Sequence, residues 1–138
     1  MSNPKLLQAE LNRIALRYKK QQSIFNRFSE DVIEFFTRNK LIDDLTFTSH
    51  IDLGYFVVSF INRQLQFRFE FDDMGSSLIC IYDITDPKEI KKKLTCNFDG
   101  QGKVPYKDDD ADDIYITNGN GCALFVHLLH EAVRPSTA

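Results

Sequence analysis

The chain contains no tryptophan, only three cysteines and no long hydrophobic run. Cys80, Cys96 and Cys122 are odd in number and widely spaced, so neither a disulfide framework nor a thiolate zinc site is predicted. No stretch approaches the roughly 20 apolar residues needed to span a bilayer, and the N-terminus lacks the apolar core of a signal peptide. We therefore expect a cytoplasmic protein without a membrane partner.

The sequence also lacks an excess of basic residues, since 17 Lys and Arg face 20 Asp and Glu, for a formal net charge of −3. Proteins devoted to sequence-independent DNA binding carry a basic excess, so a nucleic-acid partner is not expected. A basic protein partner is electrostatically easier to accommodate. The 138 residues suit a single domain over 1–138, and 12 Phe predict a core built largely from aromatic rings.

The stretch 54–71, GYFVVSFINRQLQFRFEF, predicts the central β-hairpin of the fold. Its apolar residues alternate with polar ones from 64 to 71, which is typical of a strand with one buried face. A two-residue turn at Asn62-Arg63 places the apolar residues of both strands on that face. The predicted cross-strand pairs are Phe60–Leu65, Val58–Phe67 and Phe56–Phe69.

The N-terminal segment, about 4–39, has a heptad pattern typical of a helix. We call its repeating positions the seam: Leu7, Leu11, Ile14, Tyr18, Gln21, Phe25, Phe28, Val32 and Phe35. One helix from Pro4 to Arg38 is about 50 Å long, longer than a domain of this size is wide. We expect a break at Gln21-Gln22-Ser23 and two helices packed on the sheet. The alternative is a projecting helix that acts as a dimerising arm.

The remaining elements complete an α+β fold. Strands are predicted at 45–51, 77–82, 94–98 and 114–117, with a short helix from Asp86 to about Lys93 and an exposed loop over 104–113. A closing helix spans 122–133, and its apolar stripe consists of Leu124, Phe125, Leu128, Leu129 and Ala132. We therefore expect an antiparallel meander of about five to six strands within 44–134, with the terminal helices over its phenylalanine face.

An acidic stretch is the most unusual local feature; it contains Asp108, Asp109, Asp110, Asp112 and Asp113. The stretch departs from the EF-hand calcium-binding pattern at two positions, because the sixth is Asp113 rather than Gly and the twelfth is Gly119 rather than Glu. A like-charged run is otherwise a solvated loop or a contact for a cationic partner. We predict a partner-binding surface here, with Tyr106 and Tyr115 as flanking anchors.

A second acidic group follows from the predicted hairpin. Gly54 opposite Phe71 brings Asp52 near Asp72 and Asp73, where clustered carboxylates suit Mg²⁺ or acid–base chemistry. Turn-tip aspartates are, however, common in hairpins without any such role. We keep these three residues as weak metal candidates and expect no cofactor.

The other candidate motifs in the sequence are weaker indications of a functional site. His127 and His130 are three apart on the closing helix without a third ligand, and Gly119-Asn120-Gly121 lacks the last glycine of a dinucleotide fingerprint. Cys122, at a helix start, has no suitably placed base. The cationic run 91–93 has no interleaved aromatic residues and suits a solvated face.

No catalytic constellation emerges, so we expect a non-enzymatic protein-binding module. Its form would be an immunity or inhibitor protein that neutralises a basic partner, such as a toxic nuclease, through an acidic surface. One alternative is a small divalent-metal-dependent enzyme or ligand-binding domain that uses the clustered aspartates. Another is an assembly or secretion chaperone that acts through the N-terminal seam, with a possible homodimer.

Overall fold

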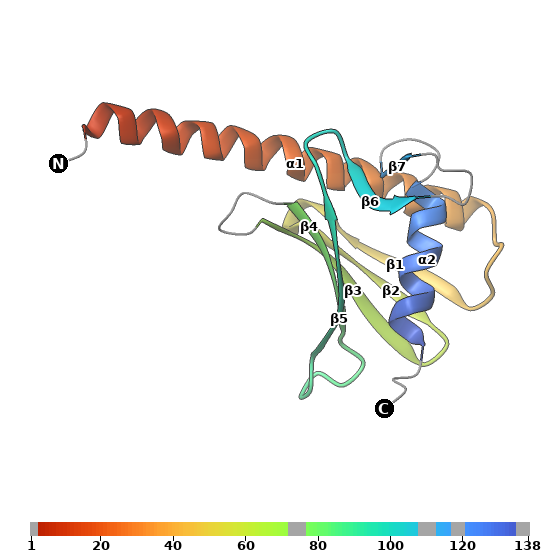
Figure 1. Ribbon diagram of the computed structural model, residues 1–138. Helices are drawn as coiled ribbons and strands as arrows, with labels where there is room; N and C mark the ends of the chain where they lie inside the picture. Colours follow the sequence, from red (N-terminus) through yellow and green to blue (C-terminus); the bar gives the residue numbers. More distant parts are fainter. Residues whose placement is uncertain (1–2, 72–76, 108–112, 117–120, 135–138) are drawn as a thin grey trace.

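The computed structural model describes residues 3–71, 77–107, 113–116 and 121–134. The predicted α+β architecture is confirmed, with a long helix, a five-stranded antiparallel meander, a small hairpin and a closing helix (Figure 1). The meander has the strand order β1-β2-β3-β4-β5, and β6 pairs with β7 in a separate sheet. The elements are α1 (Pro4–Arg38), β1 (Leu45–His50), η1 (Ile51–Leu53), β2 (Tyr55–Phe60), β3 (Arg63–Phe71), β4 (Ser77–Asp83), β5 (Lys91–Phe98), β6 (Lys103–Lys107), β7 (Asp113–Tyr115) and α2 (Gly121–Val133).

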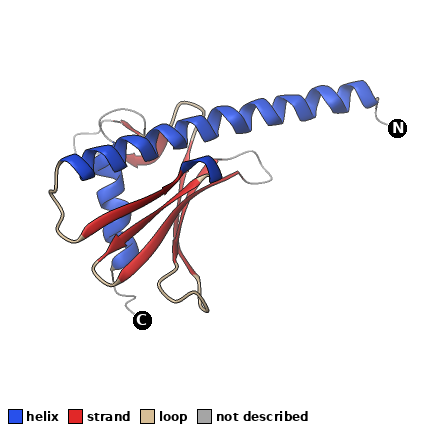
Figure 2. Cartoon of the chain, turned by 180° about the vertical axis from the view of Figure 1, so that it is seen from behind, coloured by secondary structure: helices blue, strands red, loops and turns tan. Residues whose placement is uncertain are grey.

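Helix α1 is one continuous helix of 35 residues, so the expected break at residues 21–23 is wrong. Gln and Ser residues lower the stability of a helix only slightly when they lie in its interior. Gln21 is buried at the point where α1 reaches the sheet. The N-cap residue of the helix is Asn3, whose side chain accepts a hydrogen bond from the Lys5 backbone N–H. Residues 4–20 are exposed, and the N-terminal part of this segment projects beyond the sheet (Figures 1 and 2). We call this segment the arm.

The buried face of α1 shifts by one residue at its C-terminal end. Phe25, Phe28 and Val32 are buried as the seam predicts, but Phe36 replaces Phe35 in the core. An α-helix has 3.6 residues per turn, so a strict seven-residue repeat drifts around its surface. Phe35 is therefore left 38% exposed at the end of the helix.

The β2–β3 hairpin has the predicted faces but a different register. Its turn residues are Ile61 and Asn62, so Val58 pairs with Leu65 and Phe56 with Phe67. This is a shift of two residues from the predicted pairs. Because side chains alternate with a period of two, the shift leaves every apolar residue on the same face.

The predicted short helix after Asp86 is wrong. Asp86 instead forms a turn, in which its carboxylate accepts a hydrogen bond from the Lys88 N–H and its carbonyl accepts one from the Glu89 N–H. Strand β5 begins at Lys91 and pairs with β4 along its length, apart from an irregularity at Ile81/Tyr82. Lys91 and Lys92 pair with β4, and Lys93 falls at the irregularity. This strand pairing satisfies backbone groups and overrides the local helix signals.

The predicted loop over 104–113 is also wrong in part. Residues 103–107 form β6 and pair with β7, and Val104 is buried. The Ile116 N–H donates a hydrogen bond to the Gly102 carbonyl, which ties the end of β7 to the start of β6. Helix α2 follows and buries all five residues of its predicted stripe.

The core lies between one face of the meander and the two helices. Phe56 stacks on Phe67 with ring centroids 5.1 Å apart, and both rings contact Phe125 of α2. Phe25 of α1 covers the same face, 6.2 Å from Phe56. The prediction that both terminal helices pack over the phenylalanine face is confirmed. Figure 2 shows α1 crossing the sheet before it projects.

Candidate functional site

A groove of about 690 Å³ lies between the last turns of α1 and the first turns of α2. We call it the α1–α2 groove. Three of its apolar residues, Phe35, Leu41 and Val126, are exposed although they are large. Phe36, Ile42, Ile116 and Ala123 also line it. Because exposed apolar surface is gathered here in a concave shape, the groove is suited to bind a partner.

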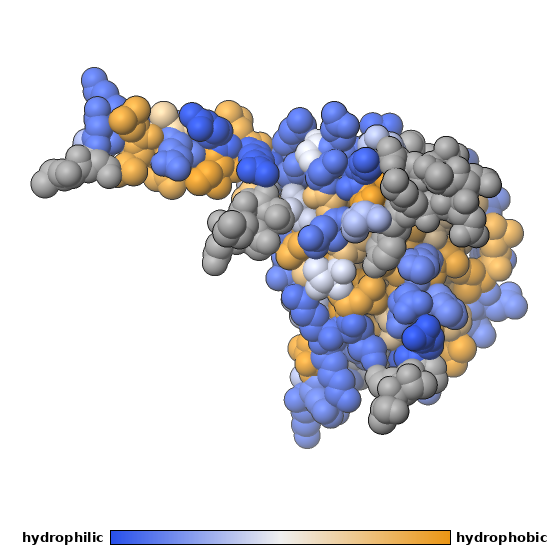
Figure 3. All heavy atoms as spheres, in the orientation of Figure 1, coloured by the Kyte–Doolittle hydropathy of each residue, from blue (hydrophilic) through white to orange (hydrophobic). Residues whose placement is uncertain are grey.

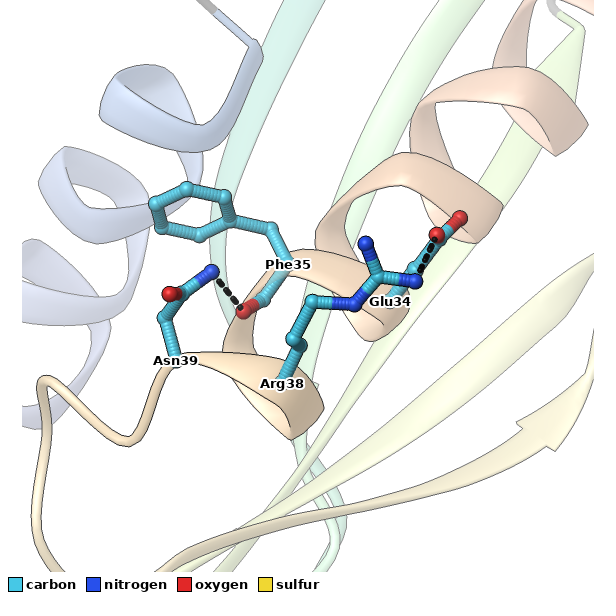
Figure 4. A network of polar contacts seen from close by, with 4 residues as sticks. All are labelled: Glu34, Phe35, Arg38 and Asn39. Atoms are coloured by element: carbon cyan, nitrogen blue, oxygen red, sulfur yellow. Dashed lines mark hydrogen bonds and ion pairs between the residues drawn. The ribbon is translucent and has the colours of Figure 1, made fainter.

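The end of α1 holds one wall of this groove in place. The Asn39 side chain donates a hydrogen bond to the Phe35 carbonyl at 3.2 Å, and its backbone N–H donates to the same oxygen at 2.8 Å. Arg38 forms an ion pair with Glu34 at 3.0 Å. These contacts end the helix, and the Phe35 ring points from α1 toward α2 (Figure 4).

The start of α2 holds the opposite wall. Gly121 lies so close to the preceding chain that an added Cβ would be 2.5 Å from the Ile116 carbonyl oxygen and 3.4 Å from Phe28. Only glycine fits this approach without displacing the backbone. The close packing sets the position of Cys122 and Val126 relative to α1.

The α1 side of the groove carries two carboxylates and one guanidinium, that of Arg38. Asp31 and Glu34 line it; Glu34 is paired with Arg38, whereas Asp31 forms no ion pair with another described residue. Burial, together with the charge of Asp31, raises the pKa of Cys122. The thiol is therefore protonated at neutral pH, and the helix start does not activate it as a nucleophile.

The predicted acidic stretch lies next to this groove along the chain. Asp108, Asp109, Asp110 and Asp112 fall outside the described residues, and Asp113 begins β7. Asp113 is three residues before Ile116 of the groove lining, a span of at most about 10 Å of extended chain. Tyr115 is half-buried in β7, and Tyr106 lies in β6.

The second predicted acidic group is not assembled by the described residues. Asp52 is exposed in η1, and Asp72 and Asp73 fall outside the described residues. The Phe69 N–H donates to the Gly54 carbonyl, so Gly54 lies opposite Phe69 rather than Phe71. Across the described ranges, no three His, Cys, Asp or Glu side chains are grouped to hold a metal ion.

A polar cluster on the helix-free face of the sheet is a second candidate surface. Tyr82 donates a hydrogen bond to Glu70, Arg68 lies 4.9 Å from the centre of the Tyr55 ring, and His50 stacks on Tyr55. Burial and the hydrogen bond to Glu70 raise the pKa of Tyr82 to about 12. The cluster is internally paired and holds a neutral phenol, so it supports packing rather than catalysis.

Among the described residues, the remaining sequence candidates are not brought together as a site. His130 is exposed and lies 4.0 Å from Glu131, and His127 is exposed on the same helix. The cationic residues 91–93 belong to β5, where Lys91 pairs with Glu89 at 3.5 Å. Gly119 and Asn120 of the possible phosphate turn lie outside the described residues.

Sequence analysis missed the α1–α2 groove, because its lining comes from segments far apart in the chain. The available signals were two apolar residues outside the buried stripes, Leu41 after α1 and Val126 on the outer side of α2. Among the helices described here, none has the length and apolar character needed to cross a membrane. No family model, curated protein or solved structure matches this chain.

Proposed function

We propose that this chain is a non-enzymatic protein-binding module that receives a basic partner protein at the α1–α2 groove. The observation that carries the proposal is an exposed apolar groove whose α1 rim bears Asp31, which has no ion pair among the described residues, and Glu34, which is paired with Arg38. Apolar contact at the centre of an interface supplies affinity, and carboxylates at its edge favour cationic partners.

The acidic stretch supports the same partner class. Its five aspartates precede Ile116 of the groove lining by three to eight residues in the sequence. Negative charge there steers a basic protein toward the surface and raises the association rate. An inhibitor or immunity-type role toward a basic enzyme, such as a nuclease, is the biological form that we propose.

The test is affinity capture from host lysate with matched variants of the purified chain. Asp31→Lys/Val126→Lys changes the rim charge and adds a cation to the groove. Asp52→Lys/Leu53→Lys makes the same chemical change in η1, where both residues are exposed. Because all four side chains are exposed, thermal unfolding should show that both variants remain folded.

The expected result is a basic protein that binds the wild type and the η1 variant and is lost from the groove variant. Its purified form should bind the wild type at least tenfold more tightly than the groove variant. Equal binding to both variants, or a bound protein without basic character, would contradict the proposal.

A further inference from the structure

The arm carries an apolar stripe that the described part of the chain leaves uncovered. Leu7, Leu11 and Ile14 continue the same seam that buries Phe25 and Phe28 farther along α1, yet they are 46%, 66% and 48% exposed. Figure 3 shows hydrophobic and hydrophilic residues side by side on the arm. A helix that projects into water with an uncovered apolar stripe presents a surface for another molecule.

The stripe is continuous with the folded core at the base of the arm. The Tyr18 ring lies 5.6 Å from Phe69 and 5.6 Å from Phe71, but 40% of Tyr18 remains exposed. The body therefore holds the base of the arm, and the rest of the arm continues from it as part of the same helix. This preorganisation reduces the entropy lost on association.

The spacing of the stripe is self-complementary. In heptad terms, Leu11 and Tyr18 occupy a positions, and Leu7 and Ile14 occupy d positions. Two antiparallel helices pack each a residue against a d residue of the other. A twofold axis between residues 12 and 13 sets Leu11 against the partner's Ile14 and Tyr18 against the partner's Leu7, twice each.

The charges beside the stripe select this antiparallel arrangement. Glu10 and Arg17 occupy the two g positions, which face each other across an antiparallel pair, so Glu10 meets the partner's Arg17 twice. A parallel pair would instead set these residues against the partner's Ala15 and the partner's Gln22. The other cations of the arm, Lys5, Arg13, Lys19 and Lys20, occupy b and c positions away from the contact.

We infer that two copies of this chain associate through their arms as an antiparallel, twofold-symmetric helix pair. In this register residues 4–8 of one arm are level with residues 17–21 of the other. A pocket of about 450 Å³ there is lined by Arg17, Gln21 and Ser77. Gln21 Oε1 and Ser77 Oγ are buried and lack hydrogen-bond partners among the described residues. Arg17 of this lining is exposed, and in this register the first turn of the partner's arm is level with it.

The contact is short, with four seam side chains from each copy, so the dimer belongs to the class of small, weak interfaces. A dissociation constant between about 1 μM and 1 mM is expected. This dimer uses a surface separate from the α1–α2 groove, so the two proposals succeed or fail independently.

Sedimentation equilibrium from about 10 μM to 1 mM protein tests the association directly, because this range covers the expected dissociation constant. Leu11→Glu and Ile14→Glu should each weaken dimerisation by at least tenfold. Leu16→Glu is the matched control, since Leu16 is 69% exposed on the same arm but lies opposite the stripe. A wild type that remains monomeric at 1 mM, or a control that weakens association as much as Leu11→Glu, would overturn the inference.

A charge exchange tests the antiparallel register. Glu10→Arg alone and Arg17→Glu alone each place like charges together twice, and should weaken dimerisation about threefold to tenfold. The double variant restores opposite charges and should return association to the wild-type level. Failure of the double variant to recover would overturn the register.

A helix with basic and apolar residues can also bind a lipid surface. Binding of the chain to vesicles of phosphatidylcholine and phosphatidylserine should therefore be measured as well. Vesicle binding by a chain that stays monomeric in solution would assign the stripe to lipid and overturn the dimer. Circular dichroism of each variant should show unchanged helix content and thermal unfolding, because the substituted residues lie outside the core.

Discussion

The Tyr82 hydroxyl donates a hydrogen bond to the Glu70 carboxylate across the helix-free face of the sheet. Glu70 lies on β3 and Tyr82 on β4, on either side of the paired residues Arg68 and Cys80. The Tyr82 side chain therefore lies along the sheet and helps to bury Cys80, which has no helix above it. The contact joins two strands and makes the stability of this face depend on pH.

Tyr82→Phe should lower the free energy of unfolding by about 0.5–1.5 kcal/mol at pH 7, toward the smaller value because the pair is partly exposed. Burial alone would raise the pKa of Glu70, but hydrogen bonds from Tyr82 and Cys80, with Lys92 and Arg68 nearby, lower it. The ionised carboxylate thus stabilises the fold above the unfolded pKa of about 4.3, and this contribution is lost as the pH falls.

The same pair predicts a loss at alkaline pH. The pKa of Tyr82 is raised to about 12, so its neutral form stabilises the fold below the unfolded pKa of about 10. That contribution decreases as the pH rises from 10 toward 12. Urea unfolding of wild type and Tyr82→Phe at pH 3, 7 and 11 should show the largest difference at pH 7. A constant difference would contradict the assignment.

Phe125→Ala should be among the most destabilising substitutions, because the ring contacts Phe36, Phe47, Phe56 and Phe67 from both layers. Loss of a fully buried Phe costs about 3–5 kcal/mol of unfolding free energy. The neighbouring residue Val126 is 41% exposed, so Val126→Ala should cost less than about 1 kcal/mol. Urea denaturation measures both values, and similar costs would contradict the described core.

The faces of the strands were predictable from sequence, whereas their register was not. Alternation from 54 to 71 assigns each side chain to a face, but a slip of two residues preserves those faces, so only the turn decides the pairing. Asn62 was a reasonable turn residue, yet the turn begins at Ile61, a residue type that resists positive φ. The helix predicted after Asp86 failed for a related reason, since strand pairing outweighed local signals.

The α1–α2 groove could not be predicted from the sequence because it depends on tertiary contacts. Phe35 becomes exposed only because the seam drifts around a straight helix. Phe35 and Val126 line one groove because Gly121 allows α2 to start against Ile116. By contrast, the uncovered stripe of the arm follows from the heptad spacing once α1 is known to continue unbroken through Gln21.

Ile61→Gly should raise the free energy of unfolding. Ile61 has φ 57°, a left-handed conformation that is unfavourable for a β-branched side chain, and it is 72% exposed. Glycine adopts this conformation without strain, so a gain of about 1 kcal/mol is expected. Ile90→Gly is the comparison, because Ile90 is also exposed, at 59%, but has no positive φ. Thermal unfolding should show stabilisation only at residue 61.

The three thiols should react at different rates in the folded chain. Burial raises the pKa of Cys96 to about 12, and burial with the nearby Glu70 raises that of Cys80 to about 11. Cys122 is only partly buried. Iodoacetamide at pH 8 should therefore modify Cys122 first, as located by peptide mass spectrometry, and all three after unfolding. Faster modification of Cys96 would contradict the described burial.

The acidic stretch should control the rate of partner association more than the dissociation rate. Replacement of Asp108, Asp109, Asp110, Asp112 and Asp113 by Asn removes long-range attraction while it preserves side-chain size. With the basic partner identified by capture, stopped-flow measurements should show a slower association rate, by about tenfold at low salt, and a weaker dependence on ionic strength. Replacement of Asp83, Asp86 and Glu89 by their amides is the control, because Asp83 ends β4, Asp86 and Glu89 lie in the β4–β5 connection, and none of the three lines the groove. An unchanged association rate in the first variant would contradict electrostatic steering by this stretch. The groove variants would still test apolar docking.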